Sequence, residues 1–505
     1  MSANTETINQ DRAFGLGRVP AWFWLGVGAY LLLLINGSRL LNDSDTYWQI
    51  AVGRWILDHG AFPHVDIYSF TKAGEPWIST SWLAQILYAE TYELAGWAGP
   101  VILAASCIAA TFALLAFILS RRVLSTYATI IVLAALALSA SHLLARPHVL
   151  ALPVMLAWVN GIMSASESRE APSFRLLPLI ALWANLHGGF VLGLALVVPF
   201  VFDALWNAES SQRQSLALRW VAFGICALAA CCVTPYGWQS ILASRTILEL
   251  GDLLHLISEW MPADFGSFSM FEACVLALIA GALYYGVKLS PPRIVLVLGL
   301  FHLALSHVRN IEIFALLLPL VVLTPLSLQF GLQAPRIAEK ALPAVFAAAL
   351  AAILGVSTWA FAADNKLVPT AIQSPAAAVD VLKDHNSKRV LNDLPFGGYL
   401  ISRGLPVFID GRAELYGEKF EMAYYNALQL KNVDLFIGML KSYDIDAVLL
   451  TPSAPAASLL DHLDGWQRAY ADETALVYIR TSDRPARFGS LAQTVPCSVC
   501  SSFTN

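Results

Sequence analysis

The stretch AWFWLGVGAYLLLLINGSRLL occupies residues 21–41 and carries a single charge, Arg39, near its end. As one α-helix it would be about 31 Å long, enough to cross the hydrocarbon core of a bilayer. The remainder of the chain has the same character: its 505 residues are 57% hydrophobic and 13% charged, with a mean hydropathy of +0.61. Soluble globular proteins do not have this composition. The sequence therefore predicts an α-helical polytopic membrane protein whose first span is an uncleaved anchor.

Ten more apolar segments follow, so we expect about eleven transmembrane helices. Together with the first, the eleven apolar segments lie near residues 21–41, 97–118, 125–143, 148–165, 176–186, 189–206, 216–233, 268–287, 294–306, 310–329 and 341–361. If the N-terminus is cytoplasmic, every cytoplasmic connection carries two Arg or Lys, and the opposite short loops carry one or none. The positive-inside rule favours this orientation. We predict a cytoplasmic tail over 1–20 and a multispan domain over 21–361, with a large non-cytoplasmic first loop over 42–96.

Beyond residue 361 the composition changes, because charged residues return. Short β-type runs at 389–391, 406–409, 447–450 and 475–479 alternate with helical stretches. This alternation predicts a soluble C-terminal α/β domain over 362–480, on the same side as the first loop. Residues 481–505 show no periodicity, and we expect a mobile tail there.

The first loop begins with two acids, Asp43 and Asp45, and contains two amphipathic stretches, 45–59 and 81–94, that predict interfacial helices. The acids have three interpretations. One of them is a general base that deprotonates an acceptor. Alternatively, the pair binds a divalent cation, Mg or Mn, together with His64 and Asp66. Finally, Asp43 only caps the helix that starts near Asp45.

Unusual polar residues gather on the predicted non-cytoplasmic side, which suggests a cavity open to that side. Arg146, His148, His307 and Arg309 are suited to phosphate oxygens, although each arginine can instead snorkel at a helix end. The turn from Asn185 to Phe190 contains glycines that permit close approach of a ligand or, equally, tight helix packing. The other residues that we expect in this pocket are His64, Asp66, Asn185, His187 and Glu259.

The chain resembles the GT-C class of integral membrane glycosyltransferases, and more closely a group of bacterial GT-C-like membrane proteins. The resemblance lies in Asp43 to Trp55, His64-Val65-Asp66, Trp77, Asn185 to Phe190, Arg309-Asn310, Asn392-Asp393 to Gly398 and Phe408 to Arg412. It implies a GT-C-like bundle in a bacterial inner membrane, with the C-terminal domain in the periplasm. It also implies inverting transfer of a sugar from a polyprenyl-phosphate carrier to a glycan, lipid or protein acceptor. Asp43 or Asp45 matches the acidic residue that this class carries in its first loop. Some members need a divalent metal and others do not.

The main alternative is a transporter or flippase for a lipid-linked or anionic substrate, because polar residues in a helical bundle also mark transport pathways. Transporters commonly show repeated halves and broken helices that meet near the bilayer midplane. This chain has no internal repeat and concentrates its polar residues toward one face, which favours the enzyme. The net charge of −5 selects no partner, and we expect no nucleic acid.

Overall fold

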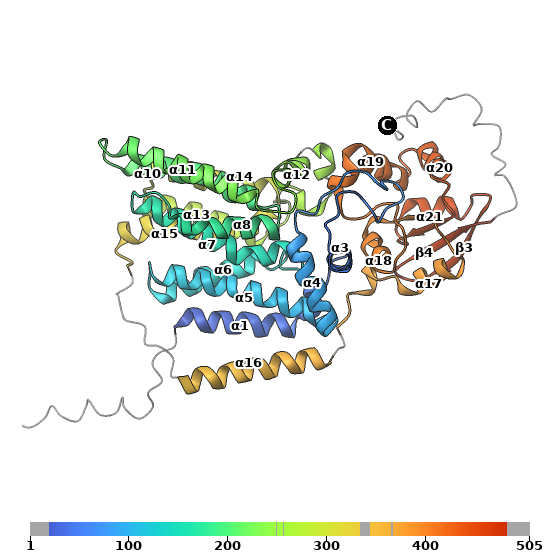
Figure 1. The fold of residues 1–505 in the computed structure, drawn as a ribbon, viewed down its shortest axis with the longest axis horizontal. Coiled ribbons are helices and arrows are strands. Elements are labelled where there is room, and N and C mark those ends of the chain that lie inside the picture. The colour runs from blue at the N-terminus through green and yellow to red at the C-terminus, as the bar shows by residue number, and fades with distance from the viewer. Residues whose placement is uncertain (1–19, 249, 256, 334–343, 365–366, 482–505) are drawn as a thin grey trace, which may run out of the picture.

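A computed structural model describes residues 20–248, 250–255, 257–333, 344–364 and 367–481. The predicted tails over 1–20 and 481–505 lie almost entirely outside these residues. The described chain consists of a bundle of side-by-side helices and, at one end of it, an α/β unit (Figure 1). The first-loop helix α3 lies between the two (Figure 1).

Within the described residues, the bundle contains five helices that are long and apolar enough to cross a membrane. They are α5 (Ala98–Ser120), α7 (Pro147–Glu167), the consecutive α9 (Phe190–Ala195) and α10 (Val197–Asn207), α11 (Arg213–Cys231) and α15 (Asn310–Phe330). Six further apolar helices complete it: α1 (Ala21–Ile35), α6 (Ser125–Ser139), α8 (Leu177–Leu186) after the 3₁₀ turn η2 (Phe174–Leu176), α13 (Met270–Tyr285), α14 (Pro291–Ser306) and α16 (Ala344–Asp364). All eleven fall on the predicted apolar segments. That each crosses the membrane, and in which orientation, stays a prediction.

The first span is not the single helix that residues 21–41 predict. Helix α1 ends at Ile35, and the chain continues after Asn36 as the short helix α2 (Gly37–Leu40). Asn and Gly are weak helix formers, so a break here costs little. Gly37 also allows a close approach of α16, because a Cβ on it would lie 2.9 Å from the ring of Phe361. The break turns the chain toward the first loop.

The first loop contains the two predicted helices, α3 (Asp45–His59) and α4 (Trp82–Ala95). Helix α3 ends at Gly60, whose φ of 58° is the left-handed conformation common at helix C-termini. A second connection, between α11 and α13, holds α12 (Gln239–Leu248) and the 3₁₀ turns η3 (Gly251–His255) and η4 (Ser258–Trp260). Turn η4 approaches the start of α3, as described below.

The α/β unit is built on a four-stranded sheet in the order β1-β2-β4-β3. Its strands are β1 (Val390–Asn392), β2 (Ala447–Leu450), β3 (Trp466–Ala471) and β4 (Leu476–Arg480); β1 pairs with β2 in parallel, and the other two pairs are antiparallel. The helical elements of this unit are η5 (Ala371–Gln373), α17 (Ala376–Asp384), η6 (Leu394–Phe396), α18 (Gly397–Ser402), α19 (Ala413–Leu428), α20 (Val433–Ser442) and α21 (Pro455–Leu460).

The predicted strand over 406–409 is not a regular strand. Val407 makes isolated parallel bridges to Val390 on one side and to Ser69 of the first loop on the other. The proline at 406 has no N–H to contribute to a ladder, so only a short bridge forms. A piece of the first loop thereby extends the edge of the C-terminal sheet.

Helix α3 and the α/β unit share one hydrophobic core. Tyr47, Trp48, Val52 and Ile56 of α3 are buried in the same cluster as apolar residues of α17, α18 and strands β1, β2 and β4. Each fully buried aliphatic or aromatic side chain in such a core stabilises it by about 1.5–3 kcal/mol. The α/β unit therefore fixes the position of α3, and with it the acids at its start.

Candidate functional site

The first loop starts with a turn that presents two carboxylates at the beginning of α3. Asp43 is an ionisable residue, yet only 4% of its surface is exposed. Its Oδ1 accepts a hydrogen bond from the backbone N–H of Asp45 at 2.9 Å, and its Oδ2 forms an ion pair with Nε of Arg146. The hydrogen bond from the N–H of Asp45 resembles the helix cap considered for Asp43. The contact with Arg146 is an ion pair. Asp43 therefore both braces the first turn of α3 and holds Arg146.

Arg146 joins three carboxylates from two separate parts of the chain. It precedes Pro147, the first residue of α7, and is held in an extended conformation. Its guanidinium pairs with Asp43 and Glu259, and its terminal nitrogen lies 3.5 Å from Oδ2 of Asp45. The predicted phosphate ligand Arg146 and both predicted catalytic acids thus lie in one cluster. Contact of Arg146 with a donor phosphate stays a prediction.

Asp45 has a different environment from Asp43. Its side chain is 26% exposed, and its Oδ1 accepts a hydrogen bond from the indole Nε1 of Trp48 at 3.0 Å. Gly411 of the α/β unit lies against it, since a Cβ on that glycine would be 2.1 Å from Oδ1 of Asp45. Burial raises the pKa of Asp45 to about 7, whereas the Trp48 hydrogen bond lowers it. Three nearby carboxylates raise this pKa further: Glu259, Asp410 and Glu414.

A second arginine stands beside Glu259. The backbone N–H of Arg309 donates to the carbonyl of Glu259 at 3.0 Å, and its guanidinium lies 4.5 Å from the ring centre of Trp260. Among the described residues, no carboxylate comes within ion-pair distance of Arg309. His307 turns toward Trp260 instead, with Nδ1 2.7 Å from its carbonyl oxygen. Arg309 is therefore the cation of this site whose charge is least compensated.

A cluster of buried polar side chains lies next to these arginines. His148 Nε2 is 3.0 Å from the carbonyl of His142 and 3.8 Å from Oε2 of Glu312. The ring of His187 lies 6.2 Å from that of His148. Glu312 is 3% exposed, and its Oε1 has no hydrogen-bond partner among the described residues. The sequence analysis missed Glu312, although a carboxylate inside an apolar segment is itself a sign of function.

The predicted metal set does not assemble. Asp66 is engaged elsewhere, since its Oδ1 accepts from NH1 of Arg412 at 2.7 Å. His64 is exposed and packs edge-on against Tyr236. Within the described ranges, no three His, Cys, Asp or Glu side chains are grouped to hold a metal ion. That Mg or Mn binds the remaining acids stays a prediction.

Asp66 instead belongs to a buried ion cluster that ties the first loop to the α/β unit. Arg412 is fully buried and forms a two-pronged pair with Asp410, at 2.8 and 2.7 Å. Tyr416 donates to the same carboxylate at 2.7 Å, and Trp77 packs 4.8 Å from the guanidinium. Asp410 and Arg412 therefore form a structural pair that fixes this loop against the first loop.

Asn185 also has a structural role. Its Oδ1 accepts from Nε1 of Trp82 at 2.8 Å, and its Nδ2 donates to the carbonyl of Val233 at 2.9 Å. The side chain thus joins α4, the end of α8 and the segment after α11. From the turn that begins at Asn185, His187 reaches the buried polar side chains around His148.

No protein-family model and no curated protein matches this chain. Similar solved structures include the oligosaccharyltransferase of Archaeoglobus fulgidus in its apo form (11% identity, TM-score 0.49, 85% of this chain and 70% of that chain). The AglB oligosaccharyltransferase of A. fulgidus with an inhibitory peptide and a dolichol-phosphate is similar too (11%, 0.48, 85% and 69%). So is ArnT from Cupriavidus metallidurans bound to undecaprenyl phosphate (14%, 0.49, 90% and 97%). These identities and TM-scores are low, and the chemistry of this site follows from its own residues.

Proposed function

We propose that this protein is a membrane glycosyltransferase that moves a sugar from a polyprenyl-phosphate donor to an acceptor at the outer face of a bacterial inner membrane. The observation that carries the proposal is the cluster at the start of α3: two acids, Arg146 and Glu259 lie together where the bundle meets the α/β unit. Such a position gives an amphiphilic donor access from the bilayer and a polar acceptor access from water. The resemblance of the sequence to the GT-C class indicates the same reaction.

The two acids have unequal roles in this proposal. Asp43 is buried and both its oxygens are engaged, so it positions Arg146 and the first turn of α3. Asp45 is partly exposed and has a pKa of about 7, close to the operating pH that suits a general base. Asp45 takes the proton from the acceptor hydroxyl.

The remaining bonds change in the same step. The acceptor oxygen attacks the anomeric carbon from the face opposite the phosphate, and the bond between that carbon and the phosphate oxygen breaks. The electron pair leaves with the phosphate, and Arg309, whose charge has no carboxylate partner in the described chain, stabilises it. Attack from the opposite face inverts the anomeric centre.

Mass spectrometry of the lipids and surface glycans of a deletion strain tests this function. We expect a polyprenyl-linked sugar to accumulate, and wild-type protein to clear it. Asp45→Asn should fail to clear it, and Asp384→Asn, an exposed carboxylate of α17, should succeed. An unchanged lipid and glycan profile in the deletion strain would contradict the proposal and point to transport.

A further inference from the structure

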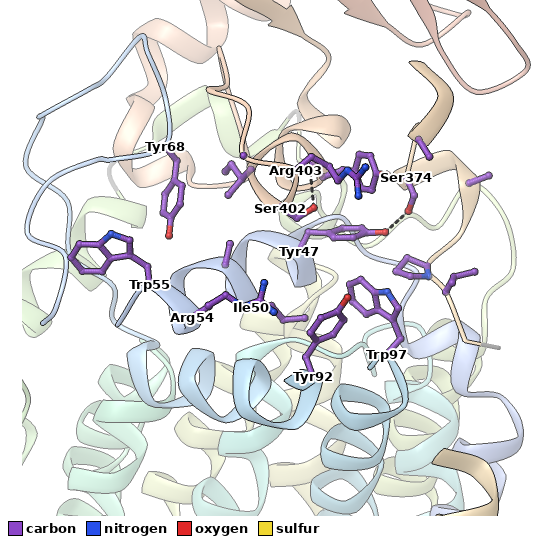
Figure 2. A pocket seen from close by; sticks show the side chains of 18 of the residues that line it. Tyr47, Ile50, Arg54, Trp55, Tyr68, Tyr92, Trp97, Ser374, Ser402 and Arg403 are labelled. Carbon is purple, nitrogen blue, oxygen red and sulfur yellow. Dashed lines mark hydrogen bonds between the residues drawn. The ribbon is translucent and has the colours of Figure 1, made fainter. Parts of the chain in front are cut away.

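A cavity of about 730 Å³ lies on the face of α3 that points away from the acids. Side chains of α3, α4, the first loop, the segment before α17 and the end of α18 line it (Figure 2). Its volume is within the range of small-molecule sites. Asp45 and Tyr47 are two residues apart, which places them roughly 200° apart around the helix. The cavity is therefore separate from the reacting centre.

Aromatic side chains dominate the lining. Trp55 comes from α3, Tyr92 from α4, Trp97 from the turn before α5 and Tyr68 from the first loop (Figure 2). Trp55, Tyr68, Tyr92 and Trp97 are all partly exposed, so they present ring surface to the cavity. Flat apolar surfaces of this kind suit a ligand that has an apolar face of its own.

One polar atom in the cavity lacks a partner. The hydroxyl of Tyr68 is buried and makes no hydrogen bond with any described residue. Figure 2 shows it pointing toward the face of α3 that carries Arg54 and Trp55. A buried hydroxyl without a partner costs about 1–3 kcal/mol, which a ligand hydroxyl can recover. The ligand should therefore offer a hydrogen-bonding group at this depth.

Both arginines that line the cavity have a carboxylate partner. Arg54 pairs with Glu93 across α3 and α4, and Arg403 lies 3.7 Å from Asp380. Asp58 also lines the cavity, so two cations face three carboxylates. An anion would gain little here, whereas a neutral ligand with many hydroxyls can use these side chains as donors and acceptors.

We propose that this cavity is a binding site for a neutral saccharide. A sugar ring has an apolar C–H face for Trp55 or Trp97 and hydroxyls for Tyr68, Arg54 and Asp58. The saccharide held here is a part of the acceptor glycan that does not react, since α3 separates it from Asp45. The assignment to the acceptor rests on the proposed function, whereas the binding site itself does not.

The test is binding of the purified full-length protein, in nanodiscs, to an array of neutral and acidic microbial glycans, followed by titration of the best binder. We expect neutral glycans to bind. Trp55→Ala should weaken the affinity by more than about 30-fold, and Tyr68→Phe, which removes only the hydroxyl, by about three- to tenfold. Trp206→Ala, an exposed tryptophan of α10, should leave the affinity unchanged.

Absence of glycan binding, binding of acidic glycans alone, or equal affinity of wild type and Trp55→Ala would each overturn this inference. So would a copurifying phospholipid that Trp55→Ala releases when no saccharide binds. A protein that binds neutral glycans but transfers no sugar would contradict the proposed reaction and leave the saccharide site intact. A protein that transfers sugar but binds no saccharide would contradict the saccharide site and leave the proposed reaction intact.

Discussion

Asp45→Asn is the most informative substitution, because it separates the effect of the Asp45 carboxylate on folding stability from its role in catalysis. The pKa of Asp45 rises from 3.8 to about 7 in the folded protein. Below pH 3.8 the carboxyl of Asp45 is protonated in both the folded and the unfolded chain and does not lower the free energy of unfolding. Between pH 3.8 and 7 the unfolded chain releases this proton more readily, so stability falls by about 1.4 kcal/mol per pH unit. Above pH 7 the loss is complete and constant.

From pH 5 to pH 8 this one group should therefore remove roughly 2.5 kcal/mol of stability. Asn keeps the acceptor for Trp48 but cannot ionise, so the variant should lose that part of the pH dependence. Thermal unfolding at pH 5, 6, 7 and 8 measures the difference between the two proteins, with Asp384→Asn as the control. Sugar transfer by Asp45→Asn should fall by about 10²- to 10⁴-fold, and wild-type kcat/KM should rise as pH increases through about 7. Parallel stability curves for wild type and variant, or full activity of the variant, would refute this account of Asp45.

Three further substitutions test the surrounding structure. Arg412→Met leaves two buried carboxylates without their counter-charge and should destabilise the protein by about 3–5 kcal/mol in denaturant unfolding. Gly411→Ala should push Asp45 aside and reduce kcat in a transfer assay, whereas Gly438→Ala, with open space around it, should not. Arg309→Gln should lower kcat for a polyprenyl-phosphate donor at unchanged thermal stability, and an unchanged kcat would remove it from the phosphate site.

Local patterns in the sequence predict the helices well. The amphipathic stretch over 45–59 coincides with α3, and the apolar segments coincide with the bundle helices, because hydrophobic periodicity is a local property. Strand β3 (Trp466–Ala471) was not predicted. Its side chains are mostly exposed, so it lacks the alternation of a half-buried strand.

The site was predictable only in part. The alternation of Arg and Lys between successive loops predicts that Asp43, Arg146, Glu259 and Arg309 lie on the non-cytoplasmic side of the membrane. The structure brings these four residues together. The partner of Asp66 is 346 residues away, and nothing local to either residue reveals such a pair. Asp66 was therefore assigned to the pocket, although it joins the first loop to the α/β unit.

The α/β unit is part of the proposed active site and not an appended module. Gly411 contacts Asp45, and two of the carboxylates that raise the pKa of that acid, Asp410 and Glu414, belong to the same segment. Glu414 accepts from Trp77 of the first loop at 3.0 Å, so the segment is held from both sides. A movement of the α/β unit would change the distance from these carboxylates to Asp45, and with it the pKa of the base. The placement of the α/β unit against α3 therefore contributes to the pKa of the proposed base.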